Sequence, residues 1–159
     1  MQVCLVSRRL RDIVQELDTE LKKPVIYREI TAAELKQLAD DFPCLLGVAC
    51  MFNFYEQQED SIDEAVEYLV DKHSGLKELK ITNARLGNKG WSNIQNLGCL
   101  EVFNVPESNI TDARLLQILK NCPNLIQLDL KCTKISGEGI TAAPLHQLKE
   151  LNLEYCRIF

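Results

Sequence analysis

The chain of 159 residues has no long hydrophobic run. Its apolar residues nowhere approach the ~20 consecutive positions that a membrane-spanning helix needs, which excludes a helical membrane span. The opening stretch MQVCLVSRR has too few apolar residues before its arginines for a secretory signal. We therefore expect a cytoplasmic or nuclear protein.

The cysteines form no CxxC pair, and their number, seven, is odd. Both facts argue against a disulfide framework, so we expect reduced, metal-free thiols that pack as small hydrophobic groups. These residues are Cys4, Cys44, Cys50, Cys99, Cys122, Cys132 and Cys156.

Basic residues are scarce after residue 30. Residues 31–159 hold twelve basic and eighteen acidic groups, a net charge of −6, whereas residues 1–30 hold six and five, a net charge of +1. Nucleic acid is bound through a basic surface, so the acidic main part of the chain argues against that partner. With 46% apolar residues, the chain is long enough to bury a substantial core.

A sequence pattern recurs along the chain. Each unit reads L-x-x-[LF]-x-[LIV], and its first leucine falls at Leu76, Leu100, Leu125 and Leu148, with separations of 24, 25 and 23 residues. A period of this length indicates stacked repeats, each with one short strand and one helix that cannot bury their apolar face alone. We therefore predict an α/β solenoid with parallel strands and outer helices over residues 31–159.

A fifth unit precedes these four. TAAELKQLADDFPCLLGVAC from Thr31 aligns with TDARLLQILKNCPNLIQLDL from Thr111, which places its first leucine at Leu45. The step from Leu45 to Leu76 is 31 residues, and we assign the surplus to a protruding loop, FYEQQED.

Helix boundaries can be read from capping residues. Thr111 and Ser61 are typical N-caps, and Thr31 with Glu34, like Ser61 with Glu64, has the spacing of a capping box. Proline is expected to end the helices at Pro43 and Pro123, and a helix containing Trp91 is expected within residues 87–97.

Alternation within each strand predicts one buried and one open face. The apolar side chains should face the helices, and the intervening residues should align across the strands in three columns on the other face. Because solenoid curvature makes this face concave and extended, we predict that it binds another protein. The first strand contributes Gly47, Ala49 and Met51, and the predicted binding residues are Glu78, Lys80, Thr82, Val102, Asn104, Pro106, Gln127, Asp129, Lys131, Glu150, Asn152 and Glu154.

The first thirty residues follow a different pattern. Apolar positions from Val6 to Leu21 fall on one face of a helix, so we predict an N-terminal amphipathic helix there. Its opposite face carries Arg8, Arg9 and Arg11, which suit an acidic partner or phosphate but equally a solvated helix face.

Two further clusters admit a chemical and a structural interpretation. Cys122, Cys132 and His146 could serve as nucleophile and base or as metal ligands, but a helix end, a strand exit and a surface position explain them without a site. An acidic cluster could bind a cation or a basic peptide, but a loop that enters a helix N-terminus explains it as well. Its members are Glu56, Glu59, Asp60, Asp63 and Glu64. We favour the structural interpretation of both, and we predict no enzymatic activity and no cofactor.

ITDARLLQILKNCPNLIQLDLKC, residues 110–132, resembles the cysteine-containing leucine-rich repeat, I-T-D-x-G-L-x-x-L-x-x-x-C-P-x-L-x-x-L-x-L-x-x-C. The last cysteine position of the pattern is filled only by Cys156, and in the preceding units it holds Ala84, Ser108 and Thr133.

VCLVSRRLRDIVQE resembles the last helical part of an F-box, which in one large class precedes such repeats. The opening of an F-box, with its L-P dipeptide, does not occur in the sequence. The resemblance implies the substrate-recognition subunit of a cullin-type (SCF) ubiquitin ligase, with residues 1–30 on a Skp-type adaptor and the repeats on a substrate. The alternative is a scaffold or inhibitor-type repeat protein, in which residues 1–30 cap the first repeat.

The last residues predict an uncovered edge. The sequence stops after the strand of the last unit, and Leu151, Leu153, Ile158 and Phe159 should be partly exposed there. We expect further repeats or self-association to cover this end.

Overall fold

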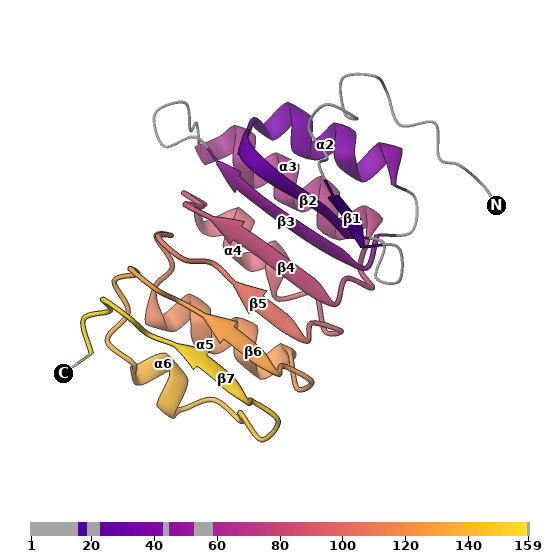
Figure 1. Ribbon diagram of the computed structural model, residues 1–159. Helices are drawn as coiled ribbons and strands as arrows, with labels where there is room; N and C mark the ends of the chain where they lie inside the picture. Colours follow the sequence, from indigo (N-terminus) through magenta and orange to yellow (C-terminus); the bar gives the residue numbers. More distant parts are fainter. Residues whose placement is uncertain (1–15, 19–22, 43–44, 53–58, 159) are drawn as a thin grey trace.

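The computed structural model describes residues 16–18, 23–42, 45–52 and 59–158. In this part of the chain, seven strands form one sheet whose order follows the sequence, with helices between successive strands (Figure 1). The strands are β1 (Glu16–Asp18), β2 (Lys23–Ile30), β3 (Gly47–Phe52), β4 (Glu78–Thr82), β5 (Val102–Asn104), β6 (Gln127–Asp129) and β7 (Glu150–Asn152). The helices are α2 (Ala32–Asp41), α3 (Glu59–Lys72), α4 (Asn88–Ile94), α5 (Asp112–Asn121) and α6 (Glu138–Thr141).

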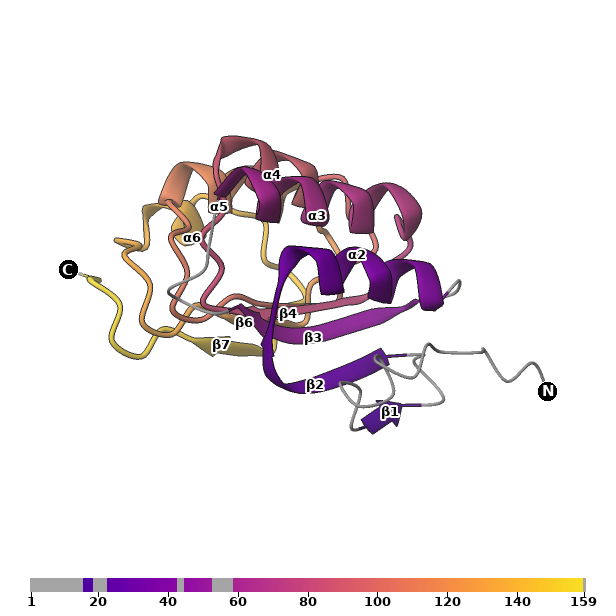
Figure 2. The same ribbon diagram turned by 90° about the horizontal axis from the view of Figure 1, so that it is seen from above.

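The molecule has two layers. All five helices cover the same face of the sheet, as the view along the layers shows (Figure 2). Strands β2 to β7 are parallel, and β1 pairs with β2 in the antiparallel direction. The fold is therefore the predicted α/β, solenoid-like array of strand and helix units.

Two helices show the internal repeat most directly. Helices α2 and α5 begin 80 residues apart in sequence, and Leu35 and Leu38 of α2 are buried in the same way as Leu115 and Ile118 of α5. Thr31 caps α2 with the predicted capping box, in which its hydroxyl accepts from the Glu34 amide at 3.2 Å. Thr111 occupies the equivalent N-cap position of α5, but its side chain makes no capping bond.

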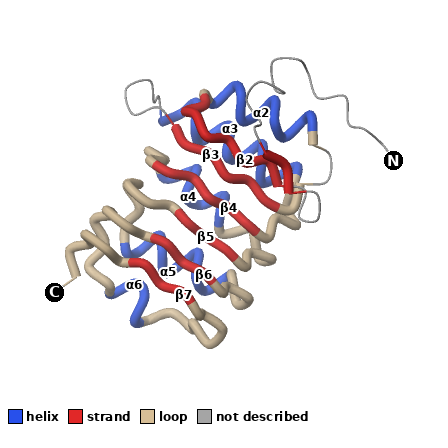
Figure 3. The backbone as a smooth tube through the Cα atoms, viewed as in Figure 1, coloured by secondary structure: helices blue, strands red, loops and turns tan. Residues whose placement is uncertain are grey.

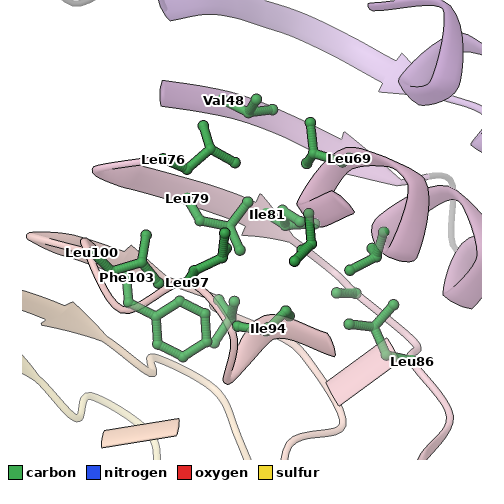
Figure 4. Close-up of a cluster of buried hydrophobic side chains, with 14 of the residues drawn as sticks. Val48, Leu69, Leu76, Leu79, Ile81, Leu86, Ile94, Leu97, Leu100 and Phe103 are labelled. Atoms are coloured by element: carbon green, nitrogen blue, oxygen red, sulfur yellow. The ribbon is translucent and has the colours of Figure 1, made fainter. Parts of the chain in front are cut away.

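The core lies between the two layers. Inward strand residues such as Leu79 of β4 and Phe103 of β5 meet helix residues such as Leu69 of α3 and Ile94 of α4, and all four are fully buried (Figure 4). Each such apolar side chain gains ~1.5–3 kcal/mol from burial, which is the main force that stacks the units.

An aspartate of one unit caps the helix of the next unit. The Asp112 carboxylate accepts hydrogen bonds from the amides of Ser136, Gly137 and Gly139 at 2.9, 3.1 and 3.1 Å, at the start of α6. Asp63 of α3 likewise accepts from the Gly87 amide at 2.8 Å, at the start of α4. These bonds satisfy helix N-terminal amides that have no partner within their own helix.

Two glycines allow the capped helices to pack closely. A Cβ at Gly90 would lie 2.3 Å from Oδ1 of Asp63, and one at Gly139 would lie 2.5 Å from the carbonyl oxygen of Asp112. Neither position has room for a side chain, so successive helices approach at these points.

Strands become shorter along the array. Strand β3 has six residues and β4 has five, whereas β5, β6 and β7 have three each, and Figure 3 shows loops replacing strand toward the C-terminal edge. Backbone hydrogen bonds nevertheless continue past the strand ends, so the units stay in register.

The N-terminal region differs from the sequence prediction. Glu16–Asp18 form strand β1, so the predicted helix from Val6 to Leu21 is wrong at these residues, and its remaining positions lie outside the described residues. Strand β2 was not predicted either. Its pairing with β1 extends the sheet beyond the first repeat, which the helical spacing of the apolar residues did not reveal.

Helix α3 also begins earlier than predicted. It starts at Glu59, so Ser61 lies inside the helix and is not an N-cap. The predicted loop FYEQQED loses Glu59 and Asp60 to this helix, and the rest of it lies outside the described residues, as does Pro43. The predicted helix around Trp91 is confirmed as α4, with Trp91 buried.

Candidate protein-binding face

The sheet has one face that carries no helix among the described residues, and we call its twelve predicted residues the strand face. Sheet pairing aligns the first column, Glu78, Val102, Gln127 and Glu150, and the second, Lys80, Asn104, Asp129 and Asn152. Gly47 and Ala49 extend these columns onto β3. The sequence therefore predicted the register of these columns correctly.

The third column continues through backbone hydrogen bonds next to it. Met51 pairs with Thr82, the Asn83 amide donates to the Pro106 carbonyl at 2.9 Å, and the Glu107 amide donates to the Lys131 carbonyl at 2.8 Å. The Cys132 amide then donates to the Glu154 carbonyl at 2.8 Å. Adjacent units thus remain aligned beyond the last strand residue.

The two faces of the strands differ in burial. Leu79, Phe103 and Leu128 point to the helices and are fully buried, whereas the strand face residues beside them keep partial exposure. The backbone of this surface is preformed, since the strand pairing of the sheet fixes it.

A repeated turn follows each of the strands β4 to β7. Asn83, Glu107, Cys132 and Tyr155 have φ angles of 60°, 57°, 57° and 58°, and each follows a third-column residue. The left-handed conformation costs a non-glycine residue about 1 kcal/mol. The turn directs the chain from the strand face back toward the helices.

Hydroxyl groups take over the position that the repeat pattern assigns to cysteine. Ser108 Oγ accepts from the Ala84 amide at 2.9 Å, and Thr133 Oγ1 donates to the Leu130 carbonyl at 2.7 Å. Cys156, which does match the pattern, donates from Sγ to the same Leu130 carbonyl at 3.0 Å. These groups satisfy backbone atoms at the strand exit, which explains why serine and threonine replace cysteine here.

Two ion pairs lie on the strand face. Lys80 and Glu78 of β4 are 3.4 Å apart, and Lys131 and Glu154 are 2.8 Å apart. The hydrogen bond that Lys131 donates to the Glu154 carboxylate raises the pKa of Lys131, whose ammonium also lies 5.5 Å from the centre of the Tyr155 ring. At the strand entrances, Lys77 and Glu101 form a third pair at 2.7 Å.

Side chains of the second column accept hydrogen bonds from backbone amides of the third column. Asp129 Oδ1 accepts from the Lys131 amide at 2.9 Å, and Asn152 Oδ1 accepts from the Glu154 amide at 3.1 Å. Asn104 is the equivalent residue of β5, but the residue two positions later is Pro106, which has no amide hydrogen. Among the described residues, Asn104 Oδ1 accordingly has no hydrogen-bond partner and is buried.

Sequence reasoning missed Tyr155 as a residue of this surface. Its side chain is 79% exposed and covers Lys131, next to the third column. The left-handed turn after β7 places Tyr155 there. The sequence signal that could have predicted it is its position directly after Glu154, a residue of the third column.

The predicted alternative site of Cys122, Cys132 and His146 has its members in three different environments. Cys122 is buried at the end of α5, where burial raises the pKa of its thiol to about 11, so the thiolate is scarce at neutral pH. Cys132 is exposed in the turn after β6, and His146 is exposed between α6 and β7. Within the described ranges, no group of three or more His, Cys, Asp or Glu residues has a metal-binding arrangement.

The acidic cluster also separates. Asp63 is buried and caps α4, whereas Glu64 is exposed and pairs with Lys36 of α2 at 3.2 Å. Asp60 is exposed in the first turn of α3, where a carboxylate complements the helix dipole. Glu56 and the arginines Arg8, Arg9 and Arg11 lie outside the described residues.

No helix among the described residues is long and apolar enough to cross a membrane.

No family model matches the chain. Among curated proteins, the chain is similar to the F-box protein FBW2 of Arabidopsis thaliana, with 32% identity over 102 residues. That alignment covers 63% of this chain and 32% of the relative, so the chain spans about a third of the length of the protein that it matches. Among solved structures, it is similar to a Bacteroides fragilis protein, with a TM-score of 0.46 and 14% identity over 78% of this chain and 39% of that chain.

Proposed function

We propose that the chain is a non-catalytic protein-recognition module and that the strand face is its binding surface. The observation that carries this proposal is the register of β4 to β7, which aligns the first two columns of the strand face opposite the helices, while backbone hydrogen bonds continue the third column. Repeat arrays use such extended faces to bind other proteins.

We further propose that this recognition serves a cullin-type ubiquitin ligase of the SCF class, in the cytoplasm or nucleus. Similarity to an F-box protein over 102 residues supports this role, as does the F-box-like segment VCLVSRRLRDIVQE. In this proposal, the strand face holds a substrate, residues 1–30 contribute to a Skp-type adaptor interface, and the units form leucine-rich repeats. Ubiquitin transfer itself would occur on other subunits.

The test is co-purification with a Skp-type adaptor. The full chain and a version that lacks residues 1–15 are each mixed with the purified adaptor and separated by size-exclusion chromatography. Co-elution of the full chain and not of the shortened one is the expected result. Failure of both to co-elute would contradict the ligase role and favour the alternative, a scaffold or inhibitor-type repeat protein.

A further inference from the structure

The strand face is divided into a neutral part and an acidic part. On β4 and β5, Glu78 and Lys80 balance each other, and Val102, Asn104 and Pro106 are uncharged. The charged residues that β6, β7 and their exits contribute are Asp129, Lys131, Glu150 and Glu154, with a net charge of −2, from one positive and three negative groups. A partner that covers this end must supply positive charge, or two carboxylates lose water without compensation.

Two of these carboxylates have no cation in the described part of the chain. Glu154 is paired with Lys131, which is also engaged by Tyr155. Asp129 accepts only from the Lys131 backbone amide, and Glu150 is exposed without an ion pair. Asp129 and Glu150 lie on the adjacent strands β6 and β7, offset by two residues along the strand direction. This offset corresponds to about 8 Å between their Cα atoms.

The unpartnered oxygen of Asn104 adjoins this pair. Asn104 and Asp129 are direct partners in the β5–β6 pairing, so their side chains are neighbours on the same face. A buried oxygen without a donor costs ~1–3 kcal/mol, and the cost persists here because Pro106 lacks the amide that the other units provide. This oxygen is buried and a bound protein does not reach it, so Asp129, which is partly exposed, and Glu150, which is exposed, are the groups that a partner meets.

We propose that Asp129 and Glu150, on the strands next to Asn104, form a subsite for an arginine or lysine side chain of the bound protein. A cationic side chain with several N–H donors donates to these two carboxylates and neutralises them in one step. The uncharged part of the face, at Val102 and Pro106, then takes the apolar residues of the same segment. This inference rests on the proposed function and specifies the chemistry of the partner.

The experiment selects peptides from a phage-displayed random library on four versions of the full chain. These are wild type, the charge variant Asp129→Asn with Glu150→Gln, the blocking variant Val102→Arg, and a control, Asp71→Asn with Glu138→Gln. The control removes the same charge at exposed residues of α3 and α6. Affinities of the selected peptides are then measured by fluorescence anisotropy at low and high salt.

Wild type and control should enrich peptides with an arginine or lysine. The charge variant should bind these peptides about tenfold more weakly, with a smaller salt dependence, and the blocking variant should not bind them.

Other results separate the subsite from the proposed function. Peptides without basic residues, blocked by Val102→Arg and unaffected by the charge variant, would overturn the subsite and leave the face as a binding surface. Peptides that bind all four versions equally would overturn both proposals. Absence of any enrichment on wild type would count against both as well.

Discussion

Leu128 and Gln127 are neighbours in sequence and belong to opposite faces of β6. Leu128 is fully buried against the helices, whereas Gln127 lies on the strand face. We expect Leu128→Ala to lower the free energy of unfolding by ~2–5 kcal/mol, because a cavity replaces the lost side chain. Gln127→Ala should change it by less than ~0.5 kcal/mol. Urea denaturation measures both values, and equal losses would contradict the alternation of the strand.

Cys132 holds a left-handed conformation that suits glycine, with φ of 57°. We expect Cys132→Val to destabilise the protein by about 1 kcal/mol relative to Cys132→Gly, because a β-branched side chain is the least tolerated at positive φ. Thermal unfolding of the two variants provides the comparison. If valine were as stable as glycine, the repeated turn would not have the geometry described.

At the scale of elements, the strand and helix units were predictable and the N-terminal hairpin was not. The positions of Leu76, Leu100 and Leu125 indicate where the strands begin. The regular period then indicates that each strand pairs with the strand of the next unit. Strand β2 has its own signal, since VIYREI is rich in β-branched and aromatic residues, but it lies between the predicted helix, which ends at Leu21, and the first repeat, and no element was predicted there.

The candidate face was predictable for a related reason. In a repeat array the alternation of one strand is copied to the next, so columns follow from sequence alone. What the sequence did not reveal are the details that depend on three-dimensional contacts. These are the orphaned oxygen of Asn104, the position of Tyr155 over Lys131, and the aspartates that cap the next helix.

The capping aspartate of α5 makes a prediction about pH. Partial burial favours a higher pKa for Asp112, but the hydrogen bonds from Ser136, Gly139 and Gly137 outweigh it and hold the pKa below its ordinary value. A lowered pKa in the folded state stabilises the protein above the unfolded-state pKa of about 3.9, and this contribution disappears as the pH falls through the folded-state pKa.

We expect Asp112→Asn to cost about 1 kcal/mol at neutral pH, because the amide group cannot accept at both of its side-chain atoms. The difference from wild type should shrink at about pH 3. Urea titrations at both pH values measure it, with Asp71→Asn, an exposed aspartate, as the control. A difference that stayed constant with pH would contradict the role of the carboxylate charge.

At the scale of the whole molecule, the apolar side chains near β7 are less buried than those of the other units. Leu151 of β7 is 44% exposed, whereas Leu128, at the equivalent position of β6, is fully buried. Ile158 is 46% exposed at the same end. The outer edge of β7 therefore combines apolar side chains with strand groups that no described residue pairs, which favours association.

We predict that the isolated chain self-associates through this edge at high concentration. Light scattering over a concentration series should show a rising mass for wild type and a constant monomer mass for Leu151→Asp. Gln117→Asp, on the exposed side of α5, serves as the control and should behave as wild type. A wild-type mass that did not change with concentration would contradict the prediction.

The most direct test of the central proposal uses a photo-crosslinking amino acid at one of two glutamines. Gln127 lies on the strand face, and Gln117 lies on the exposed side of α5, in the helix layer. Each labelled protein is expressed in cells, irradiated and purified, and its crosslinked proteins are identified by mass spectrometry. We predict that Gln127 captures a defined protein whose crosslink is lost with Val102→Arg, while Gln117 does not capture it. Capture of the same protein from Gln117 alone, or equally from both positions, would contradict the assignment of the strand face as the binding surface.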